Sequence, residues 1–140
     1  MMKSLILALL FSSTANADPV RIDEHASRKI FSVLVRSGAK VTPLSHHHDR
    51  EYALQESVRA QNITCEINLG PSCTLEIHRS EDKLQTLRIY GQDAWDIGFN
   101  LGEAGIERTR ISPESYTVAA KSLHCLLKGA GRSASCIAEE

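Results

Sequence analysis

The residues with the clearest capacity for chemistry are three consecutive histidines, His46 to His48, followed directly by Asp49. Imidazole nitrogens bind Zn²⁺, Cu²⁺ and Ni²⁺, and a carboxylate adds an oxygen ligand. In extended backbone, His46 and His48 point to one side and His47 to the other. The sequence therefore offers His46, His48 and Asp49 as candidate metal ligands.

This ligand set is incomplete, because a structural zinc site has four protein ligands. The missing ligands would have to come from distant positions such as His25 or His78, and the chain has no His-Glu-x-x-His motif. Two other interpretations stay open. One is a solvated polar loop that binds divalent metal weakly, and the other is a pH-responsive patch, since imidazoles titrate near neutral pH. We expect no bound cofactor.

Four cysteines, Cys65, Cys73, Cys125 and Cys136, form the second group of reactive residues. Each lies on the apolar side of a segment in which apolar and polar residues alternate, and turn residues separate the members of each pair. Hairpin pairing would place Cys65 opposite Cys73, and Cys125 opposite Cys136, at a separation that suits a disulfide. We therefore predict two hairpin disulfides. A redox site is disfavoured because Cys-x-x-Cys spacing is absent.

Catalytic motifs are poorly represented in the chain. It lacks the Gly-x-Ser-x-Gly turn of hydrolases and a glycine-rich phosphate loop. His124 adjoins Cys125, but neighbouring residues of a strand face opposite sides of the sheet. Glu66 and Glu76 could lie close together on a sheet, as paired acids do in glycosidases, yet nothing in the sequence marks a sugar cleft. We predict that the protein is not an enzyme.

The polar side of the cysteine-bearing strands is a candidate recognition surface. If helices cover the apolar side, the opposite side presents Glu76 and His78. Arg88 and Tyr90 lie on that same side if the alternation of faces carries over into the next strand. Tyr and Arg are enriched at protein interfaces, which makes these four residues candidate binding residues. The alternative is that they form the solvated side of an antiparallel sheet.

The elements that would position these residues follow from hydrophobic periodicity. A helical stripe predicts a helix that begins after Asp23, a candidate N-cap, and ends at Gly38. A second helix is predicted over 92–104, where Gly98 and Gly102 indicate close approach to a neighbouring element. Alternation predicts strands at 63–68, 73–79, 85–90, 116–127 and 133–138. The predicted fold class is α+β, an antiparallel sheet of about four to five strands with two helices packed on one face.

The predicted elements repeat in order along the chain. A helix, a glycine, a connection and two cysteine-bearing strands occur twice, and Ile30 and Leu34 match Ile97 and Leu101 at one offset. Residues 18–140 are therefore expected to form a single small α+β domain. Two pseudo-repeated helix–hairpin units and a chance resemblance of two similar units both remain open.

The first 17 residues indicate export. Lys3 precedes an apolar run, and Ala15-Asn16-Ala17 is a small-residue cleavage site, which is the layout of a secretory signal peptide over residues 1–17. The apolar run is too short for a membrane span, which needs about 20 residues. We expect the remaining chain to be periplasmic or secreted, without a membrane span.

The charge of the chain argues against nucleic acid as a partner. A formal net charge of −1 gives no basic footprint for nucleic acid. By elimination, the sequence predicts a small exported, non-catalytic binding protein whose partner is another exported or envelope protein. The alternative is a metal-binding protein that uses His46 to Asp49.

Overall fold

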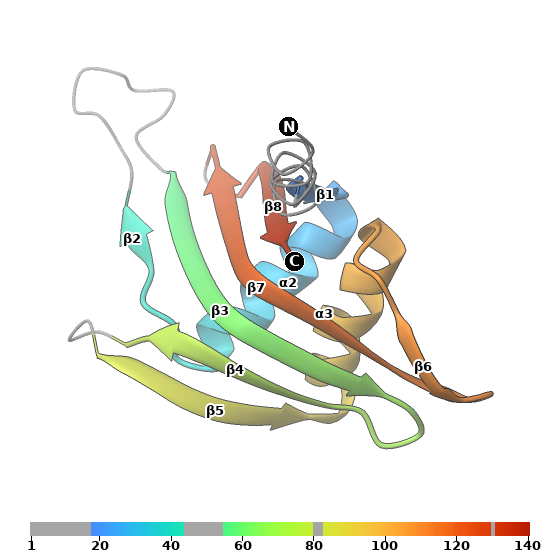
Figure 1. The fold of residues 1–140 in the computed structure, drawn as a ribbon. Coiled ribbons are helices and arrows are strands. Elements are labelled where there is room, and N and C mark those ends of the chain that lie inside the picture. Colours follow the sequence, from blue (N-terminus) through green and yellow to red (C-terminus); the bar gives the residue numbers. More distant parts are fainter. Residues whose placement is uncertain (1–17, 44–54, 80–82, 130) are drawn as a thin grey trace, which may run out of the picture.

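A computed structural model describes residues 18–43, 55–79, 83–129 and 131–140 of the chain. Within these ranges, helices and strands together form one α+β arrangement (Figure 1). The elements, in order, are β1 (Val20–Ile22), α2 (Glu24–Arg36), β2 (Thr42–Pro43), β3 (Glu56–Ile67), β4 (Ser72–His78), β5 (Leu84–Tyr90), α3 (Gly91–Ala104), β6 (Thr109–Ser112), β7 (Ser115–Lys128) and β8 (Ser133–Glu139).

The strands form an eight-stranded antiparallel sheet with the order β1-β8-β7-β3-β4-β5, in which β2 also pairs with β3 and β6 with β7. The predicted antiparallel α+β class is confirmed, but the prediction of about four to five strands is wrong. The three additional strands, β1, β2 and β6, have at most four residues each. Segments this short cannot show a clear alternation of apolar and polar residues.

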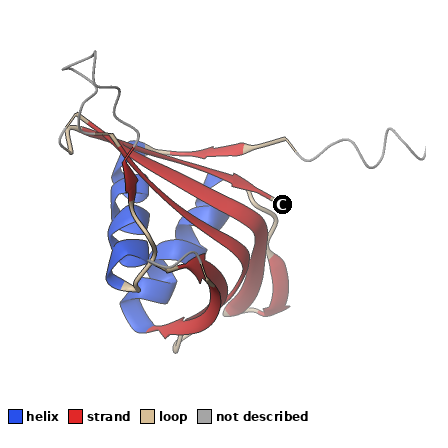
Figure 2. Ribbon diagram, turned by 90° about the vertical axis from the view of Figure 1, so that its left-hand side faces the viewer, coloured by secondary structure: helices blue, strands red, loops and turns tan. Residues whose placement is uncertain are grey.

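Both predicted helices are present and lie on the same face of the sheet (Figure 1, Figure 2). Asp23 is the N-cap of α2, because its Oδ1 accepts a hydrogen bond of 2.8 Å from the backbone N–H of Ala26. Gly38, just after the helix, has a φ of 102°, a conformation that favours glycine. The sequence therefore locates both ends of α2.

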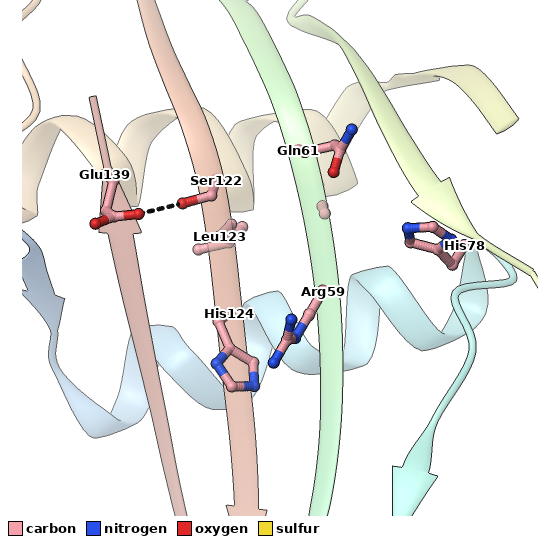
Figure 3. Close-up of a pocket in the computed structure, with 8 residues that line it drawn as sticks. Arg59, Gln61, His78, Ser122, Leu123, His124 and Glu139 are labelled. Carbon is pink, nitrogen blue, oxygen red and sulfur yellow. Dashed lines mark hydrogen bonds between the residues drawn. The ribbon is translucent and has the colours of Figure 1, made fainter. Parts of the chain in front are cut away.

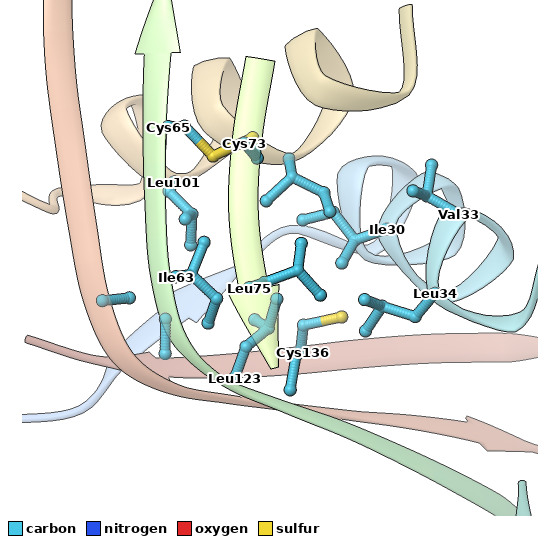
Figure 4. Packing of buried hydrophobic residues seen from close by; sticks show 14 of the residues in the cluster. Ile30, Val33, Leu34, Ile63, Cys65, Cys73, Leu75, Leu101, Leu123 and Cys136 are labelled. Carbon is cyan, nitrogen blue, oxygen red and sulfur yellow. A yellow bond between two sulfur atoms is a disulfide. The ribbon is translucent and has the colours of Figure 1, made fainter. Parts of the chain in front are cut away.

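The core fills the space between the helices and the sheet (Figure 4). Ile30 and Leu34 of α2 meet Leu75 of β4 and Leu123 of β7 in this cluster, and each of these side chains is at most 1% exposed. Large fully buried aliphatic side chains each contribute about 1.5–3 kcal/mol to folding. This burial fixes the helices against one face and leaves the opposite face of the sheet without a helical cover.

The two predicted disulfides are present. Cys65 bonds to Cys73 between β3 and β4, and Cys125 bonds to Cys136 between β7 and β8, in each case at directly paired register positions. Two buried disulfides are typical of proteins in an oxidising compartment outside the cytoplasm.

None of the described helices is long and apolar enough to cross a bilayer.

A bend in the two central strands curves the sheet around the helices (Figure 2). In β3 the buried positions change phase between Ala60 and Ile63, and in β7 they change phase between Ala120 and Leu123. The register pairs Ile63 with Ala120 and Ala60 with Leu123, so the two phase changes lie side by side. We call residues 61–62 and 121–122 the crease.

The strand order is symmetric with respect to the two halves of the chain. Each half runs strand, helix, short strand, long strand, strand, so that β1, β3 and β4 correspond to β5, β7 and β8. The order of strands in the sheet is β1-β8-β7-β3-β4-β5. If each strand is replaced by its equivalent in the other half, the same order is read from the opposite end of the sheet. The long strands correspond at a constant offset, since Val58, Ala60 and Cys65 match Val118, Ala120 and Cys125. A common origin of the halves stays a prediction.

Candidate functional site

The candidate site lies on the outer face of the sheet, which we define as the face turned away from α2 and α3. No described helix covers this face (Figure 2). Thr64 and Glu66 of β3 point to it and are exposed, whereas Cys65 between them is buried among the core residues. The outer face is therefore open to a partner along its central strands.

A hollow of about 370 Å³ lies on the outer face at the crease. It extends across four adjacent strands, with Glu139 on β8 at one border and His78 on β4 at the other (Figure 3). We call it the crease hollow. Its lining consists of Arg59, Ala60, Gln61, His78, Ser122, Leu123, His124 and Glu139.

Arg59 supplies a positive charge to the crease hollow. It lies on β3 directly opposite His124 of β7. The Arg59 side chain is exposed and, among the residues that the structure describes, it has no ion-pair partner. A guanidinium in this position can bind a carboxylate through two parallel hydrogen bonds.

His124 is held neutral beside Arg59. Burial lowers the pKa of the His124 imidazole, and the charge of Arg59 lowers it further. The hydroxyl Oγ of Ser57 lies 2.8 Å from the imidazole Nε2 of His124, which fixes the ring. The hollow therefore presents a neutral imidazole at ordinary pH, next to a permanent cation.

Each half of the chain places a glutamate against the crease. The carboxylate of Glu76 accepts hydrogen bonds from the side-chain amides of Asn62 at 2.6 Å and Gln61 at 3.3 Å. In the other half, Ser122 Oγ donates to Glu139 at 2.9 Å. The hydrogen bond from Asn62, and after it that from Gln61, lower the pKa of Glu76. Glu76 is thus an anion over the whole neutral range.

The four residues predicted as binding residues all lie on the outer face. Glu76 and His78 alternate with buried Leu75 and Ile77 on β4, and Arg88 lies beside Thr74 in the register of β4 and β5. His78 lines the crease hollow, while the Arg88 guanidinium lies 5.8 Å from the Tyr90 ring centroid near the edge of the sheet. Their role in binding stays a prediction.

Most of the residues that line the hollow are not among the site residues predicted from the sequence. Arg59 and Gln61 precede the predicted start of the strand at residue 63, because the phase change at the crease interrupts the alternation. Ser122 and His124 lie in the strand predicted over 116–127 without being predicted as site residues, and Glu139 follows the predicted end of the last strand at residue 138. One signal in the sequence could have indicated them. Val58, Ala60 and Cys65 match Val118, Ala120 and Cys125 at a constant offset, and the same offset makes residues 61–62 equivalent to residues 121–122.

The arrangement gives no support for catalysis. Ser57 and His124 are hydrogen-bonded, but Ser57 is only 5% exposed, and no described carboxylate is hydrogen-bonded to His124. Glu66 pairs with Ser72, four residues along β4 from Glu76, which separates the two residues by about 13 Å of backbone. Glycosidase acids lie about 5–9.5 Å apart. The prediction that the protein is not an enzyme remains open to direct assay.

The predicted metal ligands His46, His48 and Asp49 lie outside the described residues. Within the part of the chain that the structure describes, no group of three His, Cys, Asp or Glu residues could hold a metal ion. His25 lies on α2 and His78 on the outer face of β4, so the two candidate distant ligands are in different layers. These positions do not favour a shared site.

No protein-family model matches this chain, and no curated protein or solved structure is detectably similar to it.

Proposed function

We propose that this protein is an exported, non-catalytic binding protein that captures a carboxylate-bearing segment of another exported protein in the crease hollow. The observation that carries the proposal is the exposed Arg59 guanidinium, which lines the hollow on the open face and has no ion-pair partner among the described residues. A carboxylate from an acidic side chain or a chain terminus is the ligand that fits this group best.

Glu139, at the β8 border of the hollow, would fix the orientation of a bound segment. Glu139 on β8 is hydrogen-bonded to Ser122 and exposed, so its remaining carboxylate oxygen can accept from a cation or an N–H donor (Figure 3). A segment that carries an acidic group on one side and a donor on the other would meet both Arg59 and Glu139. Two disulfides hold the strands on which these groups lie, which reduces the entropy that is lost on binding.

Photo-cross-linking tests the proposal. A photoreactive phenylalanine analogue replaces exposed Thr64 on the outer face, and in a control protein it replaces exposed Ser32 on α2. In the cells that export the protein, we expect a discrete cross-linked product with another protein from position 64 and none from position 32. Adding Arg59→Glu should remove this product, while Lys29→Glu, the same charge change on α2, should leave it intact.

Two results would contradict the proposal. One is the absence of any product from position 64 when the protein is folded and exported. The other is a product from position 64 whose yield does not depend on Arg59, because the carboxylate contact would then be missing.

A further inference from the structure

The strand β5 forms one edge of the sheet. It pairs with β4 without interruption from Tyr90, opposite Ser72, to Leu84, opposite His78. On its other side, no strand in the described part of the chain pairs with it. An unpaired edge presents a row of N–H and C=O groups that can accept a further strand.

The hydrogen bonds at the two ends of β5 show which backbone groups face this free edge. Gly91 N–H donates to Pro71 C=O at 3.0 Å, and Arg79 N–H donates to Lys83 C=O at 3.1 Å. Lys83 and Gly91 therefore belong to the set that bonds to β4, and partners alternate along an antiparallel strand. Leu84, Thr86, Arg88 and Tyr90 consequently direct their N–H and C=O groups away from β4.

This edge has few of the features that usually prevent pairing. Between Leu84 and Tyr90 there is no proline or lysine, the single charged residue is Arg88, and the register with β4 shows no bulge. Leu84 is 45% exposed and Tyr90 is 65% exposed, which places a large apolar side chain near each end of the strand. Burial of these two side chains would favour addition of another strand.

We propose that β5 pairs antiparallel with β5 of a second copy of this chain, with the twofold axis at Leu87. In this register Leu84 lies opposite Tyr90 of the second copy, and Thr86 lies opposite Arg88. Every N–H and C=O group that faces the free edge then lies opposite a matching group, because 84, 86, 88 and 90 pair among themselves. The two exposed apolar side chains cover each other on the outer face.

The neighbouring symmetric registers are less favourable. An axis at Thr86 leaves Tyr90 beyond the end of the partner strand and exposed. An axis at Arg88 places two arginines directly opposite each other, and like charges in that position are destabilising. The register at Leu87 is therefore the one that the sequence of β5 favours.

Charge complementarity supports the same register. Thr86 Oγ1 lies 3.5 Å from a carboxylate oxygen of Glu76, one strand further into the sheet. When Arg88 of one copy lies opposite Thr86 of the other, its guanidinium can extend over Thr86 toward that ionised Glu76. The twofold axis repeats this contact, so two opposite-charge contacts flank the centre of the interface.

The pairing would close on itself. A twofold contact between identical edges consumes both and produces a dimer rather than a filament. The edge at the other end of the sheet, β1, has three residues and offers a poor alternative partner. Interfaces that bury less than roughly 1,200 Å² are usually weak, and a single pair of seven-residue strands is a small contact, so we expect a micromolar dissociation constant.

Analytical ultracentrifugation of the purified protein with a matched pair of variants tests the dimer. Thr86→Pro removes an N–H that faces the free edge and leaves the backbone hydrogen bonds to β4 intact, whereas Thr86→Val keeps that N–H. Both variants lose the hydroxyl that contacts Glu76, so Thr86→Val controls for that loss. We expect a monomer–dimer equilibrium that Thr86→Pro weakens by more than about tenfold and Thr86→Val by less than about threefold. A monomer at all concentrations, or a dimer that is indifferent to Thr86→Pro, would overturn the proposal.

Disulfide cross-linking between variants with one introduced cysteine tests the same dimer and does not depend on the folding of the proline variant. In the proposed register Leu87→Cys brings two thiols opposite each other at the axis, while Gln85→Cys lies opposite Ile89 of the second copy. Both substitutions are on the helix-facing side of β5. We expect covalent dimers to form at least about tenfold faster from Leu87→Cys, and equal rates would overturn the proposed register. This inference is independent of the crease hollow.

Discussion

Asn62 combines two properties that few residue types offer together. Its φ of 51° lies in the left-handed region, which asparagine tolerates better than most residues, and its side-chain amide donates to Glu76 at 2.6 Å. One residue thus allows the phase change of β3 and holds the carboxylate of the neighbouring strand. The curvature that produces the crease hollow depends on this position.

Substitution of Asn62 separates its two roles. Asn62→Gly should keep the backbone conformation and lose the hydrogen bond, whereas Asn62→Ala loses both. We expect Asn62→Ala to lower the free energy of unfolding by about 1 kcal/mol more than Asn62→Gly, as measured by urea denaturation. Equal losses in the two variants would show that the backbone conformation at residue 62 carries no strain for alanine.

His124 should make stability depend on pH in the weakly acidic range. Its pKa is lowered in the folded protein from the ordinary value of 6.5, first by burial and then by Arg59, so the unfolded chain binds a proton more readily. The free energy of unfolding should therefore fall as the pH drops through 6.5, until the folded-state pKa is passed. The lowered pKa of Glu76 affects stability only near and below its ordinary value of 4.5, which is more acidic than the range of about pH 5.5 to 7.5 in which His124 is tested.

Thermal melting of the protein and of His124→Gln, at several pH values between 7.5 and 5.5, measures this contribution. Glutamine keeps a polar partner for Ser57 but does not titrate. We expect the melting temperature to fall more steeply with acidification in the unmodified protein than in the variant. Parallel pH profiles would assign the acid sensitivity to other histidines.

At the scale of elements, α3 owes its position to glycines that approach the sheet to different degrees. A Cβ atom on Gly98 would overlap the Ile67 side chain of β3 and would lie 2.8 Å from Cys65 Cβ. A Cβ atom on Gly102 would meet only the guanidinium end of Arg108, 2.6 Å away at Nε, which can move. The first contact is with packed core atoms and the second with a flexible side chain.

The two alanine variants should therefore have different effects on the free energy of unfolding. Gly98→Ala should lower the free energy of unfolding by about 1–3 kcal/mol, since overpacking outweighs the gain in helix propensity. Gly102→Ala should be neutral or raise it by up to about 1 kcal/mol. Urea denaturation measures both, and a loss in Gly102→Ala as large as that in Gly98→Ala would contradict the assignment of the close contact to Gly98.

The same elements show what the sequence could and could not predict. Alternation predicted the cysteine-bearing strands and both disulfides, and a capping residue and a glycine located α2. The first half of β3 was missed because the phase change at Asn62 breaks its period, and Arg59 and Gln61 of the hollow were missed with it. β1 is set by long-range pairing with β8, whereas β2 and β6 each pair with the strand that follows them. All three are too short for their own residues to show an alternation.

At the scale of the whole molecule, the halves are interleaved rather than placed side by side. β1 of the first half pairs with β8 of the second, β5 of the second half pairs with β4 of the first, and β3 pairs with β7 along most of its length. Neither half can form its own complete sheet, because its outermost strand belongs to the other half. The halves should therefore be unable to unfold separately.

Urea unfolding should accordingly show one transition for both halves. The single tryptophan, Trp95, stacks on Phe99 at 4.9 Å between ring centroids and reports on α3 by fluorescence, while far-UV circular dichroism reports on both helices and the sheet. We expect the two signals to coincide at every urea concentration, as in two-state unfolding. A residual dichroism change after the fluorescence transition is complete would show that the first half persists alone. That outcome would mean that the strands exchanged between the halves contribute little to the stability of either half.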